Sequence, residues 1–214
     1  MTTSEIRQIA DFWLATSQDA PETAFARRDW WYEGAPEIDD EIRARFGALI
    51  VQACNRELMH WTASAEGSFA LVLLLDQFTR NIYRNTPRAY AGDACSFEVV
   101  CDAIAGGQDG EMHPVSRIWL YHPFHHSEEL AEQDRGLALL QTLRNEAEPA
   151  WHAYVERSIR GWTRHRDIVA RFGRFPHRNA VLGRVSTDEE QRFIEGGAES
   201  FGQGLADTGA QPTR

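Results

Sequence analysis

The segment from Ser68 to about Tyr83 constrains the fold most, because apolar residues cover nearly every side of the helix that it predicts. A helix with no polar face until Asp76 must lie inside the protein, so the rest of the chain has to surround it. Its strongly apolar run, 69–75, is too short for a membrane span, which takes about 20 residues. We expect burial of Phe69, Leu71, Val72, Leu74, Leu75 and Phe78.

Helical periodicity and capping signals recur along the rest of the chain, whereas the alternating pattern of a strand does not. Thr2 and Glu5 form a capping box, Pro36 suits the first position of a second helix, and Ser186 with Glu189 forms another capping box. Further helices are expected at 93–104, 127–143 and 149–172. The sequence therefore predicts an all-α protein with a single domain over 1–201 and a frayed tail over 202–214.

Composition narrows the classes of function. A formal net charge of −10 argues against a general nucleic-acid binder. All 22 basic residues are Arg, so Schiff-base chemistry, lysine-bound pyridoxal phosphate and a P-loop lysine are excluded. Three cysteines without a CxxC pair, and a polar amino terminus without a secretory signal, predict a cytoplasmic protein.

A first polar block occupies the end of the apolar helix, at 75–84. Asp76 and Arg80 are four residues apart and can pair, and Gln77 and Asn81 are expected to do the same on the next face. A charged pair in so apolar a helix has to be satisfied. Either it pins helices together, or Arg80 and Asn81 face a cavity.

A second polar block, 121–129, holds three histidines ahead of a helix expected to begin at Ser127. Pro123 keeps His122 extended, so the three histidines are not expected on one helix. The positive end of the following helix favours neutral imidazoles at His125 and His126, which suit a metal or a proton transfer. Their spacing matches no zinc motif, so we predict no metal and favour polar packing.

A third polar block, 171–179, lies in a stretch with a local charge of +5 between Arg164 and Arg184. Pro176 suits the first position of a short helix that Gly183 ends. Side chains in its first turn, at 177–179, would lie beside free backbone N–H groups, which is an anion-binding arrangement. Alternatively, these arginines pair with surplus carboxylates of the same fold. The sequence leaves both open.

Three motifs resemble, in order, the bacterial family catalogued as domain of unknown function 924: LDQFTRNIYRNTPRAY, HPFHHSEELAEQ and RFGRFPHRNAVLGRVSTDEE. The DFW and RRDWWY segments also look like the opening of that family, and the resemblance covers about 10–195. It implies antiparallel helix pairs in a tetratricopeptide-repeat-like bundle or right-handed superhelix, and it implies no activity. The family's polar motif positions correspond here to Asp76, Gln77, Arg80, Asn81, His126, Ser127, Glu128, Arg171, Arg174, His177, Arg178, Asn179 and Arg184.

The leading hypothesis is a pocket for a small anion, either a carboxylate or a phosphate. Its candidate ligand-binding residues are Arg80, Asn81, His126, Glu128, Arg174, His177, Arg178 and Asn179. Catalysis would use His126 or His177 as general base, oriented by Glu128, although no nucleophile is evident. One alternative is a peptide-binding scaffold in which the motifs are internal staples, and a weaker one is a metal-dependent hydrolase. No cofactor, membrane or nucleic-acid partner is expected, and the oligomeric state is open.

Overall fold

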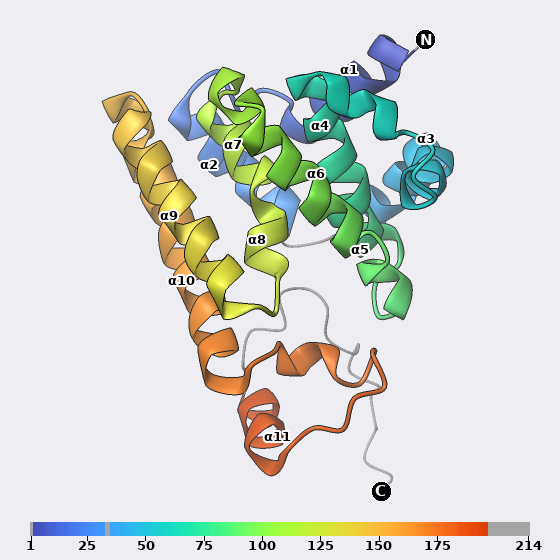
Figure 1. The fold of residues 1–214 in the computed structure, drawn as a ribbon, viewed down its shortest axis with the longest axis vertical. Helices are drawn as coiled ribbons and strands as arrows, with labels where there is room; N and C mark the ends of the chain where they lie inside the picture. The colour runs from blue at the N-terminus through green and yellow to red at the C-terminus, as the bar shows by residue number, and fades with distance from the viewer. Residues whose placement is uncertain (1, 33–34, 197–214) are drawn as a thin grey trace, which may run out of the picture.

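The computed structural model describes residues 2–32 and 35–196 (Figure 1). Helices dominate these residues and no strand occurs among them, which confirms the all-α prediction. None of the helices in these two ranges has the length and apolar character needed to cross a bilayer. The expected tail at 202–214 lies outside the described residues, and the single domain over 1–201 stays a prediction.

The helical elements follow one another with short connections. In chain order they are α1 (Thr2–Leu14), α2 (Pro21–Tyr32), α3 (Pro36–Cys54), η1 (Met59–Ala63), α4 (Ala65–Val72), η2 (Leu73–Phe78), α5 (Thr79–Ile82), η3 (Pro87–Tyr90), α6 (Asp93–Ala105), η4 (Gln108–Glu111), α7 (Pro114–Leu120), α8 (His122–His126), α9 (Leu130–Glu146), η5 (Pro149–Trp151), α10 (His152–Phe172), η6 (Pro176–Arg178) and α11 (Asp188–Glu195).

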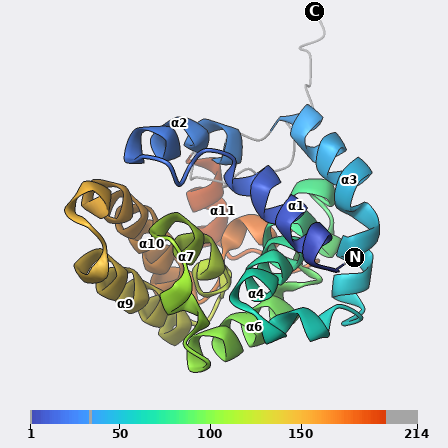
Figure 2. The ribbon, with the colours of Figure 1, turned by 90° about the horizontal axis from the view of Figure 1, so that it is seen from above.

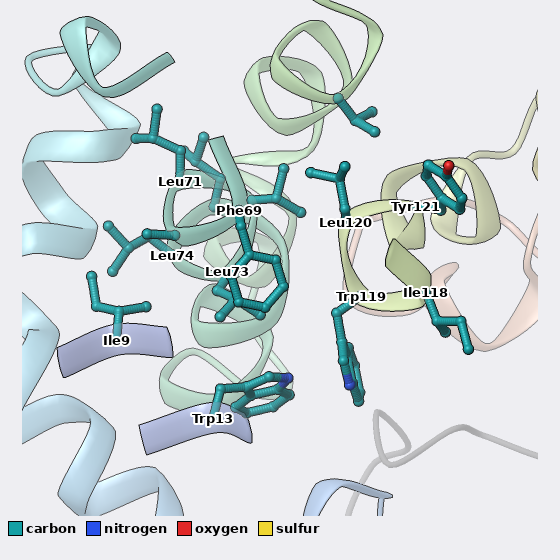
Figure 3. Packing of buried hydrophobic residues seen from close by; sticks show 14 of the residues in the cluster. Ile9, Trp13, Phe69, Leu71, Leu73, Leu74, Ile118, Trp119, Leu120 and Tyr121 are labelled. Carbon is teal, nitrogen blue, oxygen red and sulfur yellow. The ribbon is translucent and has the colours of Figure 1, made fainter. Parts of the chain in front are cut away.

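The central apolar segment forms α4, η2 and α5 without a break, and η2 has the wider turn of a π-helix. Ser64 caps this helix by accepting a hydrogen bond from the Gly67 N–H. All six residues predicted to be buried here are in the core, as expected. Side chains of α1 and α7, including Trp13 and Trp119, pack close to them (Figure 3). The π-turn was not predicted, and such turns recur at functional sites.

A long antiparallel pair, α9 and α10, forms one side of the molecule (Figures 1 and 2). Besides α9, α10 contacts α2, α7 and α8, so the pair packs against helices from earlier parts of the chain. Gly173 ends α10 with a left-handed backbone, at φ +68°, a conformation that glycine adopts without steric cost. The chain then reverses into η6 and α11.

The histidine block differs from its prediction, because α8 contains all three histidines on one short helix. Pro123 lies in the first turn of α8, where its missing N–H would have no helical partner, so it does not keep His122 extended. Ser127 ends α8 and does not begin α9, whose N-cap is Glu129.

Two carboxy-terminal details also differ. The helix expected from Pro176 to Gly183 is only the short 3-10 helix η6, because the backbone N–H groups that follow bond at mixed spacings and continue no single helix: Asn179 to Pro176 O, Leu182 to Arg178 O and Arg184 to Asn179 O. The capping box lies one residue later than predicted, at Thr187 and Glu190.

Candidate functional site

A cavity of about 440 Å³ lies where the three polar blocks meet. The residues that line it come from α2, the π-turn with α5, η3, α8, α10 and η6. Its lining residues are Arg28, Trp31, Tyr32, Gln77, Arg80, Asn81, Arg84, Tyr90, His122, His125, His126, Arg157, Ser158, Gly161, Trp162, Arg164, His165, His177 and Arg178.

The lining is strongly cationic. It includes six arginines, whereas no Asp or Glu lines it among the described residues. The carboxylates that pair with some of these arginines are not among the lining residues. Arg80 donates to Asp93 at 2.9 and 3.0 Å and contacts Asp76 at 3.1 Å, while Arg84 donates to Asp39 at 2.6 Å. Although burial opposes it, Asp76 and Asp93 raise the pKa of Arg80 above its ordinary value.

Arg178, from η6, is the most buried cation on the cavity wall, and its side chain forms no ion pair within 2–32 and 35–196. It is 7% exposed, and its Nε has no hydrogen-bond partner within the part of the chain that the structure describes. Its guanidinium lies over the rings of Phe175 and Tyr90, at 4.4 and 4.9 Å from their centroids. Burial and the neighbouring Arg80 lower its pKa. Arginine nevertheless stays protonated in proteins, so Arg178 places a poorly compensated positive charge on the cavity wall.

Five histidines also line the cavity: His122, His125, His126, His165 and His177. Their rings pack tightly, with 3.8 Å between the centroids of His125 and His165, and His125 stacks on Trp162. Burial lowers the pKa of all five, to about 4 for His122 and about 3 for His165 and His177. The imidazoles are therefore neutral at neutral pH and can accept protons or hydrogen bonds.

His126 has one distinctive partner. Its Nδ1 lies 2.8 and 2.9 Å from the two carboxylate oxygens of Asp76 on the π-turn. The Asp76 side chain is 1% exposed and is also held by Arg80 and by the amide of Gln77. A carboxylate accepts hydrogen bonds, so Nδ1 of His126 carries the hydrogen and Nε2 keeps its lone pair.

The structure brings five of the eight predicted ligand-binding residues to the cavity wall: Arg80, Asn81, His126, His177 and Arg178. Asn81 donates to Asp39 at 2.7 Å, so the predicted pairing between Gln77 and Asn81 is replaced by contacts with two different carboxylates. The Asp76–Arg80 pair forms as expected.

Contacts within the chain hold the other three predicted residues. Glu128 accepts hydrogen bonds from Arg184 at 2.6 Å and from the Phe175 N–H at 2.8 Å, and these contacts lower its pKa although burial opposes them. Arg174 donates to Glu190 at 2.6 and 2.8 Å, and its bond to Glu190 lowers the carboxyl pKa to about 2.

The buried Asn179 accepts from Arg184 at 2.9 Å and donates to Ser186. Internal carboxylates therefore pair with Arg171 and Arg174 of the turn 171–179. Asp76, and not Glu128 as expected, is the carboxylate that orients His126.

The sequence reasoning missed the walls that α2 and α10 supply. Arg28, Trp31 and Tyr32 come from α2, within the RRDWWY segment. Arg157, Gly161, Arg164 and His165 come from α10, where spacings of three, four and seven place them on one face. That spacing was available in the sequence, but α10 carries arginines on several faces, so the functional stripe does not stand out.

No group of three or more His, Cys, Asp or Glu side chains suited to a metal ion is found within 2–32 and 35–196.

The fold and the site thus define the class of this protein: it is a helical protein with a cavity lined by arginine and histidine. The chain belongs to the family described as bacterial protein of unknown function (DUF924), whose model matches residues 9–198. It is also similar to a solved structure, the protein of unknown function ATU0120 from Agrobacterium tumefaciens. That similarity has 36% identity and a TM-score of 0.77, and it covers 92% of this chain and 99% of the other. A search among curated proteins finds no match.

Proposed function

We propose that the cavity binds a small anionic ligand carrying a phosphate or a carboxylate. The observation that carries this proposal is Arg178, a buried guanidinium on the cavity wall whose Nε lacks a partner among the described residues. Leaving such a group unsatisfied costs free energy, and two oxygens of a carboxylate or a phosphate match the paired donors of a guanidinium. An incoming anion would compensate the positive charge of Arg178 and would also meet the neighbouring positive charge of Arg80.

The shape of the site favours a ligand over a scaffold of internal staples. If the polar blocks served only to hold helices together, their side chains would meet around each other and leave no room. Glu128 with Arg184 and Arg174 with Glu190 do form such staples. Arg80, His126 and Arg178, one from each block, instead share an open cavity. The peptide-binding scaffold, its repeat-like superhelix and the cytoplasmic location stay predictions.

Thermal unfolding with inorganic phosphate tests the proposal. A ligand that binds only the folded state stabilises it by about 2.7 kcal/mol at 100 times its Kd. We expect millimolar phosphate to raise the Tm of the parent protein above that in sodium chloride of equal ionic strength. Arg178→Gln should abolish this rise.

The matched control is Arg171→Gln, because Arg171 is exposed and paired with Glu189 outside the cavity. It should keep the phosphate-induced rise in full. A rise of equal size in the parent and in Arg178→Gln, or no rise in the parent, would contradict the proposed site.

A further inference from the structure

The hydrogen-bond pattern at Asp76 places a proton acceptor, His126, beside Arg80, one of the arginines of the proposed anion site. Asp76 contacts both Nδ1 of His126 and the guanidinium of Arg80, so the two side chains converge on one buried carboxylate. Both line the cavity. An oxyanion bound at Arg80 would therefore lie next to His126, whose remaining nitrogen, Nε2, keeps its lone pair. The His126 side chain is 16% exposed, which leaves it accessible to a ligand but largely shielded from solvent.

We infer that this protein is a hydrolase of phosphate monoesters, in which His126 is the general base that activates water and Asp76 is its positioning residue. This inference rests on the proposed anion site and names its substrate class and reaction. Phosphate monoesters are favoured over carboxylates because they carry up to two negative charges at neutral pH, and six guanidinium groups line the cavity. Arginines that hold the transferring phosphoryl oxygens stabilise the charge that develops on them.

The proposed step balances in atoms and charge. A water oxygen attacks phosphorus while one of its protons passes to Nε2 of His126. The bond from phosphorus to the ester oxygen breaks, its electron pair stays on the leaving oxygen, and that oxygen takes a proton from solvent. His126 then returns its proton to solvent. The products are an alcohol or phenol and inorganic phosphate, and no oxidant, reductant or second substrate is needed.

Two other lining histidines are placed differently. Nδ1 of His122 lies 2.8 Å from the carbonyl oxygen of Ile118, and its ring stacks on Trp119. Nδ1 of His165 lies 3.3 Å from the carbonyl oxygen of Gly161. A carboxylate stabilises the imidazolium formed during base catalysis better than a neutral carbonyl does, so His126 is the best suited of the three.

Hydrolysis of p-nitrophenyl phosphate tests the inference. We expect the full-length parent to release p-nitrophenol, and His126→Asn to lower kcat/KM by about 100-fold or more. His60→Asn is the matched control, because His60 lies in η1, away from the cavity, and it should keep the parent rate. His126→Asn should also keep the phosphate-induced rise in Tm, which shows that the variant folds and still binds.

Different results would overturn the anion site and the hydrolase. If phosphate does not stabilise the parent, the anion site and the hydrolase both fail. If phosphate stabilises the parent but p-nitrophenyl phosphate is not hydrolysed, or if His126→Asn hydrolyses it at the parent rate, the hydrolase is overturned and the anion site stands.

The role of Asp76 has a spectroscopic test. Long-range proton–nitrogen NMR spectra of the parent should show His126 as the neutral tautomer with hydrogen on Nδ1, and Asp76→Asn should mix the two tautomers. A parent spectrum with the hydrogen on Nε2 would overturn the assignment of His126 even if Asp76→Asn does not fold.

Discussion

Nδ1 of His126, on α8, lies 2.8 Å from the carboxylate of Asp76, on the π-turn of the central helix 50 positions earlier. The same carboxylate contacts Arg80 one turn further along, and Arg80 also reaches Asp93 on α6. One buried acid therefore joins the central helix to the histidine helix and sets the orientation of two cavity side chains.

Asp76→Asn should destabilise the protein by about 3 kcal/mol, near the lower end of the range for a broken buried pair. An amide cannot compensate the charge of Arg80, but Arg80 keeps Asp93, which limits the loss. Urea unfolding measures this change. Asp134→Asn, which removes an exposed ion pair with Arg166, should leave the unfolding midpoint nearly unchanged. Equal midpoints for the two variants would show that Asp76 does not join the helices.

Gly136→Ala should destabilise by about 1–3 kcal/mol through overpacking. A Cβ at position 136 would lie 2.8 Å from Phe124 Cβ and 3.1 Å from Trp162 Cζ3. Phe124 Cβ is tied to the backbone of α8, and Trp162 stacks on His125, so neither side chain yields easily. Urea unfolding reports the loss.

The matched control is Gly161→Ala, also within a helix, where nothing lies within 4 Å of the added Cβ. It should stabilise by up to about 1 kcal/mol, because alanine favours helices over glycine. Since Gly161 lines the cavity, the same variant also narrows the proposed site. A stabilising Gly136→Ala would mean that α9 does not pack closely against α8 and α10.

Stability should fall as the pH falls below about 6.5. The folded-state pKa is about 4 for His122 and about 3 for His165, both below the ordinary value of 6.5, because burial disfavours the imidazolium. Between these values the unfolded chain binds more protons than the folded one, so acid favours unfolding. Each pKa unit corresponds to about 1.4 kcal/mol, so each of these histidines should remove about 2 kcal/mol by pH 5.

Urea unfolding at pH 7.5, 6 and 5 measures this dependence. Glu190, whose pKa is lowered from 4.5 to about 2, adds a separate loss only as the pH falls through that lower window. His165→Asn should reduce the slope from pH 6.5 down to about pH 3, because the His165 pKa lies at these two values in the unfolded and folded states. Stability that is constant from pH 7.5 to 5 would contradict the burial of these imidazoles as neutral groups.

Local pattern determined the helical class, the buried segment and several boundaries. The expected helix at 93–104 is α6, Asp93–Ala105, and the helix expected at 149–172 is η5 followed by α10. The Asp76–Arg80 pair also followed from the sequence, because residues four apart share a helix face whatever the rest of the chain does. Interactions of this kind depend only on the geometry of one helix.

Tertiary structure decided which polar residues form the cavity wall. Arg174 and Arg178 belong to the same motif, yet packing brings Glu190 to Arg174 and leaves Arg178 facing the cavity. Glu128 lies two positions after His126, yet it binds Arg184, while Asp76 reaches His126 from another helix. A charged group is satisfied by whichever partner lies within about 3 Å, and for residues far apart in the chain that distance is set by how the helices pack.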